Sequence, residues 1–131
     1  MGDNIQRVRT LAQGRLFRIE ELPSGILVTT VWGEGTRDDL NALFDAYQPL
    51  LEAHAPVRTL TDVSGLGDVS WSARWAFAER MKENRRLIDK SAVIGLSPRL
   101  EVVLRVVLRV SRRTDLRTFD TRAAAEAWLL S

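Results

Sequence analysis

The sequence predicts an α/β domain in which a mixed sheet, built from an antiparallel hairpin followed by parallel strands, is covered by helices. Residues 1–32 hold two strand-like runs on either side of Pro23-Ser24-Gly25, a turn signal that predicts the hairpin. From residue 36 onward, helical repeats alternate with short β-rich runs, which favours parallel strands joined by helical crossovers. No linker, repeat or low-complexity segment interrupts the chain. We therefore expect a single domain over residues 1–131, with its core at about 14–130.

The expected hairpin pairs two runs of different character. Residues 14–22 alternate apolar and polar side chains, as a half-buried strand does, and residues 26–32 are β-branched and aromatic. Gly33 and Gly35 are expected to break the second strand.

The first helix is expected to begin after Thr36 as its N-cap. Asp38 and Asp39 place negative charge in its first turn, where the helix dipole favours it. Pro49 predicts a kink or an early end, and the apolar repeat stops near His54.

The middle of the chain predicts a strand, a loop and a long helix. Residues 57–63 are the strand, residues 64–68 the loop, and residues 70–89 the helix. The apolar stripe expected to bury this helix comprises Trp71, Trp75, Phe77, Ala78, Met81 and Ile88.

The last third of the chain predicts four further elements. They are a buried strand at 91–97, a helix at 99–113 with Ser97 as its cap and Pro98 in the first position, a strand at 116–119, and a final helix capped by Asp120 or Thr121. The arginines of residues 99–113 recur at helical spacing, which favours a helix over a valine-rich strand.

Composition argues against most catalytic chemistry. The chain has no cysteine, which excludes thiol catalysis, disulfides and cysteine-ligated metals, and its single His54 excludes any site that needs two imidazoles. No phosphate-binding glycine loop, dinucleotide fingerprint or nucleophile elbow is present. We therefore expect no catalytic residues, no metal site and no cofactor.

The small net charge conceals an asymmetry. Residues 1–73 carry 6 basic and 10 acidic side chains, whereas residues 74–117 carry 12 and 5. This basic span either solvates the outer faces of helices or points to a partner. Nucleic acid is not favoured, because no aromatic platform accompanies the basic span. No secretory signal or membrane-spanning run is present, so we expect a cytoplasmic protein.

Four segments in this order carry a resemblance to a known family: Ile26-Leu27-Val28 with Trp32-Gly33, Leu60-Thr61-Asp62-Val63-Ser64-Gly65, Ala92-Val93-Ile94-Gly95, and Phe119-Asp120 followed by Ala124-Ala125-Glu126-Ala127-Trp128-Leu129. Together they resemble the STAS-type domains of bacterial anti-sigma-factor antagonists, and more closely their SpoIIAA-like relatives, which are often grouped with the lipid-binding CRAL-TRIO fold. The resemblance spans about residues 14–130. It implies a STAS-like order of β-β-α-β-α-β-α-β-α and a signalling role through protein contacts.

The resemblance also implies a regulatory serine at the start of the helix that follows the third expected strand. A partner kinase phosphorylates that serine in the antagonists. Here Ser70-Trp71-Ser72-Ala73 stands where the family has an Asp-Ser-Ser-Gly type element, so the candidate acceptors are Ser70 and Ser72. Trp71 beside them argues against the usual kinase docking, and we favour Ser70 as a helix cap.

Two surfaces are candidates for binding. The first is the region where the expected loop meets the helix, and it comprises Asp62, Ser64, Gly65, Asp68, Trp71 and Trp75. Trp71 and Trp75 lie one helical turn apart, and we expect them to pack in or at the rim of the core; the alternative is a patch that anchors a protein or an apolar ligand.

The second surface is the valine-rich helix at 99–113. Its apolar residues cover an arc of about 240° at 100° per residue, whereas a helix on a sheet needs only about 100°. We expect a homodimer to cover the excess, with an apolar cavity or a neighbouring helix as alternatives. The residues assigned to this surface are Val102, Val103, Val106, Val107, Val110, Arg105 and Arg109.

The expected function is that of a non-enzymatic regulatory domain that acts through protein contacts. The alternative is the binding or sensing of an apolar small molecule or lipid.

Overall fold

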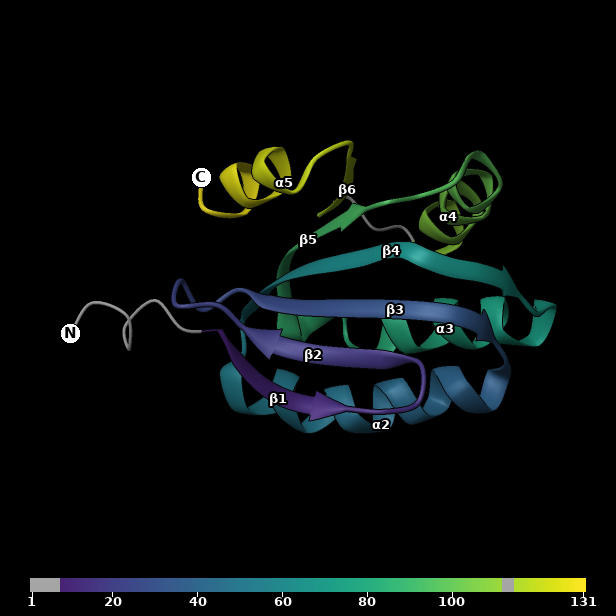
Figure 1. Cartoon of the computed structure of the whole chain (residues 1–131), viewed down its shortest axis with the longest axis horizontal. Coiled ribbons are helices and arrows are strands. Elements are labelled where there is room, and N and C mark those ends of the chain that lie inside the picture. Colours follow the sequence, from purple (N-terminus) through teal and green to yellow (C-terminus); the bar gives the residue numbers. More distant parts are fainter. Residues whose placement is uncertain (1–7, 112–114) are drawn as a thin grey trace.

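The computed structural model describes residues 8–111 and 115–131, apart from the side chains at positions 107, 108, 110 and 111. Within these residues a six-stranded sheet has the order β1-β2-β3-β4-β5-β6, so each strand pairs with its neighbours in the chain (Figure 1). The antiparallel part comprises β1 (Arg9–Gln13), β2 (Phe17–Glu21) and β3 (Leu27–Gly35). Parallel to β3 run β4 (Val57–Val69), β5 (Ile88–Ile94) and β6 (Leu116–Phe119). The predicted α/β class with a mixed sheet is confirmed.

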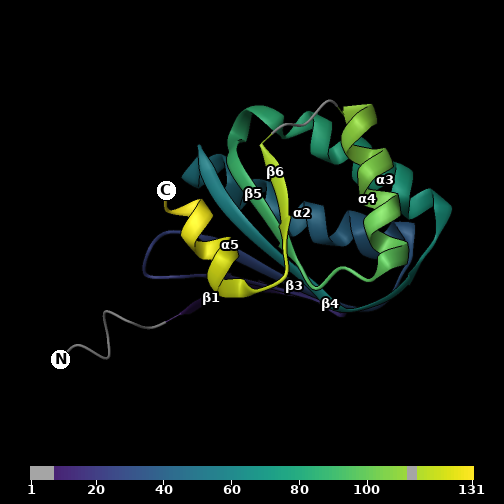
Figure 2. The same ribbon diagram turned by 90° about the horizontal axis from the view of Figure 1, so that it is seen from above.

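Helices cover the two faces of the sheet unequally. One face packs against α2 (Arg37–His54), α3 (Trp71–Glu83) and α4 (Pro98–Ser111), and the opposite face packs against α5 (Arg122–Leu129) alone (Figures 1 and 2). A short 3-10 helix, η1 (Arg85–Leu87), joins α3 to β5.

The helix starts predicted from the sequence are confirmed. Thr36 Oγ1 accepts the Asp39 N–H, and the Asp39 carboxylate accepts the Thr36 N–H in return, which completes a capping box. Ser97 Oγ accepts the Leu100 N–H at the start of α4, and Thr121 rather than Asp120 caps α5. Pro49 lies inside α2, which continues to His54.

The structure adds one strand to the prediction and changes several boundaries. The structure adds β1, an edge strand that pairs with β2. Residues 64–68 are part of β4, because Gly65 and Leu66 pair with the end of β3, which itself continues through Gly33 to Gly35. The long helix ends at Glu83, and β5 already begins at Ile88, where the prediction had the helix continue to residue 89.

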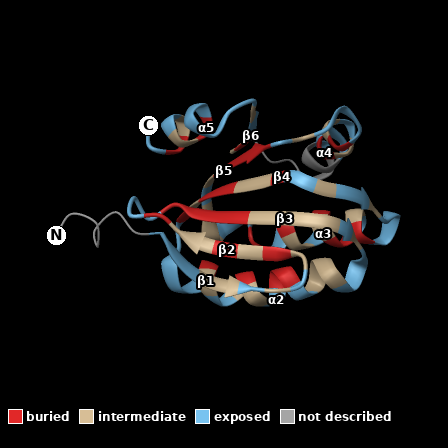
Figure 3. Ribbon diagram, viewed as in Figure 1, coloured by how far each residue is buried: buried red, intermediate tan, exposed pale blue. Residues whose placement is uncertain are grey.

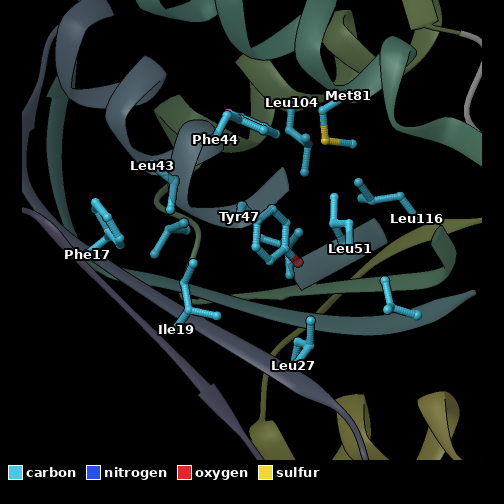
Figure 4. Close-up of a cluster of buried hydrophobic side chains, with 13 residues drawn as sticks. Phe17, Ile19, Leu27, Leu43, Phe44, Tyr47, Leu51, Met81, Leu104 and Leu116 are labelled. Atoms are coloured by element: carbon cyan, nitrogen blue, oxygen red, sulfur yellow. The ribbon is translucent and has the colours of Figure 1, made fainter. Parts of the chain in front are cut away.

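The core has two layers, one on each face of the sheet. The larger layer lies under α2, α3 and α4 and includes Phe44, Leu51 and Leu104 (Figure 4). The smaller layer lies under α5, where Ala125 and Leu129 are fully buried. Buried stretches are concentrated in the middle strands of the sheet (Figure 3).

Candidate functional site

An apolar cavity of about 190 Å³ lies between the sheet and helices α2, α3 and α4. Its walls are the inward-facing side chains of these elements, and they include Phe44 on α2, Phe77 and Met81 on α3, and Leu104 on α4. Three of these four residues, Phe44, Met81 and Leu104, are labelled in Figure 4, where they lie together on one side of Tyr47.

A few polar groups face this cavity from neighbouring strands. Thr59 Oγ1 on β4 donates a hydrogen bond of 2.9 Å to Ser91 Oγ on β5. Burial raises the pKa of the Tyr47 hydroxyl to about 12, an effect that the nearby hydroxyls of Thr59 and Thr29 partly offset. Thr29 Oγ1 itself lies outside hydrogen-bond geometry to any described atom. The cavity is therefore apolar with a small polar wall, as ligand pockets are.

Two of the predicted binding residues of β4, Asp62 and Ser64, lie on the other side of the sheet from this cavity. Thr61 and Val63 line the cavity, and since successive side chains on a strand alternate, Asp62 points to the opposite face. There its carboxylate accepts hydrogen bonds from the N–H and the hydroxyl of Ser64, at 2.9 and 2.7 Å. This part of the predicted surface is therefore separated from α3.

Gly65 and Asp68 occupy the exposed end of β4. A Cβ atom on Gly65 would lie 3.1 Å from the Cβ of Trp32 on the neighbouring strand, so this position favours the smallest residue. Asp68 forms an ion pair of 3.2 Å with Arg99 at the start of α4. Both partners are largely exposed, so this pair contributes little stability.

The first turn of α3 contains the two candidate phosphate acceptors. Ser70 is the N-cap, and its Oγ accepts the Ala73 N–H at 3.2 Å, which confirms the favoured role as a cap. Ser72 is exposed, and its hydroxyl lies 3.3 Å from that of Ser70.

The two tryptophans of α3 point outward. Trp71 is 73% exposed and Trp75 is 60% exposed, so the expectation that they pack in or at the rim of the core is wrong. The small residues Ala73 and Ala76 take the buried side of the helix instead. The guanidinium of Arg74 lies 4.6 Å from the centre of the Trp71 ring, in a cation–π contact.

The valine-rich helix α4 divides its apolar residues between inside and outside. Val103 lines the cavity, whereas Val102 and Val106 are 59% and 57% exposed. Arg105 is exposed and pairs with Glu101 at 3.4 Å, and Arg109 is exposed as well. The side chains of Val107 and Val110, assigned to the same surface from the sequence, lie outside the described residues.

Helices α3 and α4 pack beside each other (Figure 2). We call the exposed apolar side chains of these two neighbouring helices the α3–α4 surface and define it by Trp71, Trp75, Val102 and Val106.

A sequence profile described as SpoIIAA-like matches residues 26–130. The chain belongs to the SpoIIAA-like family. No curated protein matches the sequence.

Solved structures share the SpoIIAA-like fold at low sequence identity. An uncharacterized DUF3478 family protein from Shewanella loihica PV-4 has 21% identity and a TM-score of 0.63, covering 90% of this chain and 98% of that one. The unphosphorylated anti-sigma factor antagonist SpoIIAA has 14% identity and a TM-score of 0.66, over 88% and 98%. A STAS domain protein from Planctomyces limnophilus has 16% identity and a TM-score of 0.62, also over 88% and 98%. These similarities establish the fold and no shared ligand or partner.

In the part of this SpoIIAA-like chain that the structure describes, few other groups are suited to chemistry. His54 is exposed at the end of α2, with its Nδ1 3.9 Å from Glu21 Oε2, as a surface histidine would be. Among the described residues no three acidic or histidine side chains gather as a metal site. In the same part of the chain no helix is long and apolar enough to cross a bilayer.

Sequence reasoning missed the polar wall of the cavity. Thr29, Thr59 and Ser91 look like ordinary strand residues, and Asn84 lies in the charged run Lys82-Glu83-Asn84-Arg85-Arg86. The sequence held one signal for this wall. Side chains alternate between the two faces of a strand, and this alternation places all three strand hydroxyls on the face that carries the apolar core.

Proposed function

We propose that this SpoIIAA-like protein is a non-catalytic regulatory domain that binds a protein partner through the α3–α4 surface. The exposure of Trp71 and Trp75 carries this proposal. Tryptophan is the residue most enriched among those that dominate binding energy at protein interfaces, and it acts there when a partner removes it from water. Val102 and Val106 add exposed apolar side chains on the neighbouring helix.

Charge indicates the chemistry of the partner. Helices α3 and α4 carry 6 basic and 3 acidic side chains, and Lys82, Arg105 and Arg109 are exposed. Complementary charge steers association and suppresses wrong partners. We therefore propose a partner that inserts an apolar side chain between or beside the tryptophans and surrounds it with acidic groups.

The test compares capture of partners from the source cell by three forms of the protein. Trp71→Ala combined with Trp75→Ala should lose partners that the wild type retains. Leu130→Ala is the matched control, because Leu130 is also exposed, at 55%, but lies next to α5 on the other face. Equal capture by all three forms would reject the α3–α4 surface as the docking site.

Homodimerisation is the alternative use of the same surface. A two-fold dimer through Val102 and Val106 would bring Arg105 and Arg109 of both copies close together, so raised salt should strengthen it. Light scattering across a range of protein and salt concentrations separates the two proposals. A mass of two chains that dissociates on Val102→Ser supports the dimer, and a constant mass of one chain rejects it.

Phosphorylation would act on the same surface. Phosphate on Ser72 would add negative charge next to Arg74 and Trp71, and so change the charge of the surface that a partner contacts. Intact mass after isolation from the source cell tests this proposal for Ser70 and Ser72, and a protein that is unmodified under all growth conditions rejects it.

The proposed function further includes a single domain over residues 1–131, a bacterial cytoplasmic location and no cofactor.

Binding or sensing of an apolar small molecule is the second candidate function, and the cavity of about 190 Å³ favours it. Native mass spectrometry of the purified protein tests it directly. A retained small molecule that is lost on denaturation supports this function.

A further inference from the structure

Unpartnered buried polar atoms are concentrated at the cavity. Among the described residues, five buried side-chain nitrogen or oxygen atoms have no hydrogen-bond partner, and three of them belong to cavity-lining residues: Thr29 Oγ1, Arg74 Nε and Asn84 Nδ2. Buried polar groups in folded proteins are almost always paired. Their concentration around one apolar space suggests that the space normally holds a molecule with a polar group.

Asn84 is the most informative of the three. It is only 1% exposed, and its backbone N–H already bonds to the carbonyls of Arg80 and Lys82 at the end of α3. Its φ of −92° is open to any residue, and its side chain does not cap η1. The local backbone therefore gives no reason for an asparagine here, and the side-chain donor of this cavity-lining residue is left without a partner.

The cavity limits the size of the occupant. A cavity of about 150 Å³ with apolar walls holds one benzene molecule. The volume here is about 190 Å³, so a single substituted ring or a short aliphatic chain fits.

The surroundings of Asn84 limit the charge of the occupant. Met81, Ile88, Ser91 and Leu116 line the cavity near this end of α3, and none of them is charged. Arg74 lies ten residues earlier on the helix, about 15 Å away at the usual rise, with its guanidinium against Trp71. Arg80, one turn before Asn84, lies outside the lining, with its guanidinium over the Phe44 ring and paired with Asp45 at 3.3 Å. A carboxylate beside Asn84 would therefore be buried without a cation free to pair with it, which is strongly unfavourable.

We propose that the cavity binds a small neutral molecule with an apolar body and one hydrogen-bond acceptor, such as a carbonyl, to which Asn84 Nδ2 donates. This inference rests on ligand binding as a function of the protein and adds the class of ligand and the residue that anchors it.

Acetophenone and ethylbenzene provide the test, because they have nearly the same shape and differ in the carbonyl. Their affinities are measured by titration for the wild type, for Asn84→Leu and for Asn41→Leu, a control on α2 outside the cavity lining. Loss of the donor should shift the ratio of the two affinities by about tenfold toward ethylbenzene in Asn84→Leu, because the carbonyl is then desolvated without a partner. Asn41→Leu should leave the ratio unchanged.

Nuclear magnetic resonance adds a direct readout in the wild type. The side-chain amide resonances of Asn84 should move on addition of acetophenone and stay in place with ethylbenzene. Thermal unfolding of each variant checks that the fold is retained.

The outcomes separate this inference from the function on which it rests. Binding of neither compound to the wild type rejects ligand binding in the cavity altogether. Binding of both with the same ratio in wild type and Asn84→Leu keeps ligand binding but rejects Asn84 as the anchor. Tighter binding of phenylacetate than of acetophenone rejects a neutral ligand and points to a carboxylate at Arg74.

Discussion

Two threonines on adjacent strands offer a matched test of the polar wall. Thr29 and Thr59 are 3% and 2% exposed, and both line the cavity. Thr59 Oγ1 donates to Ser91 Oγ, whereas Thr29 Oγ1 has no hydrogen-bond partner among the described atoms. Threonine to valine replaces a hydroxyl by a methyl group of similar shape. The two substitutions therefore differ chiefly in whether the hydroxyl that is removed had a hydrogen-bond partner.

The expected effects have opposite signs. A buried polar group without a partner costs about 1–3 kcal/mol. Because this cavity can admit water, which would lessen that cost, we take the lower bound. Thr29→Val should therefore raise the free energy of unfolding by about 1 kcal/mol. Thr59→Val leaves Ser91 Oγ unpaired and should lower the free energy of unfolding by about 1–3 kcal/mol. For a domain of this size, 1 kcal/mol corresponds to about 4 °C in the unfolding temperature.

Thermal and urea unfolding of both single variants measure these changes. A rise with Thr29→Val and a fall with Thr59→Val would support the assignment of an unpaired hydroxyl to Thr29. Destabilisation by both would refute it and would identify the nearby Tyr47 hydroxyl as the partner of Thr29. Coupling between Thr29→Val and Tyr47→Phe in a double-mutant cycle would then measure that bond.

Three further predictions concern the scaffold. Thr36→Ala removes one half of the capping box with Asp39 and should destabilise the protein by about 1 kcal/mol in thermal unfolding. Because the pKa of Tyr47 is raised from 10.0 to about 12 by burial, the stability that its neutral form provides is complete below pH 10 and is lost toward pH 12. Unfolding temperatures from pH 9 to 12 should therefore fall less steeply for Tyr47→Phe than for the wild type. Leu129→Ala empties a fully buried position under α5 and should cost about 2–5 kcal/mol, whereas the exposed Leu130→Ala should change stability by under about 0.5 kcal/mol. Equal effects at these two leucines would contradict the packing of α5.

The order of strands and helices was predictable because it depends on local patterns. Thr36, Ser97 and Thr121 cap helices as their positions predicted, and the alternation of strands with helices indicated the parallel part of the sheet. The edge strand β1 was missed because residues 9–13 are mostly exposed and lack strict alternation. It is a strand because β2 offers it a partner, which is a tertiary effect.

The candidate site was less predictable because exposure depends on what packs against a helix. Trp71 and Trp75 look like core residues by size and spacing, but α3 turns its alanines toward the sheet. The hydrophobic pattern alone does not say which of two apolar stripes a short helix will bury. Asn84 was equally hidden, because a polar residue in a charged run is expected to face water.

Helix α3 has one side in the cavity wall and the other on the α3–α4 surface, so a small molecule and a protein partner would act on the same 13-residue element. Sites that share an element can be thermodynamically linked, and such linkage is reciprocal: a ligand that changes the affinity for a partner by some factor has its own affinity changed by that factor when the partner binds. A small molecule enclosed in the cavity could thereby be detected by a partner that contacts only the outer surface of the protein.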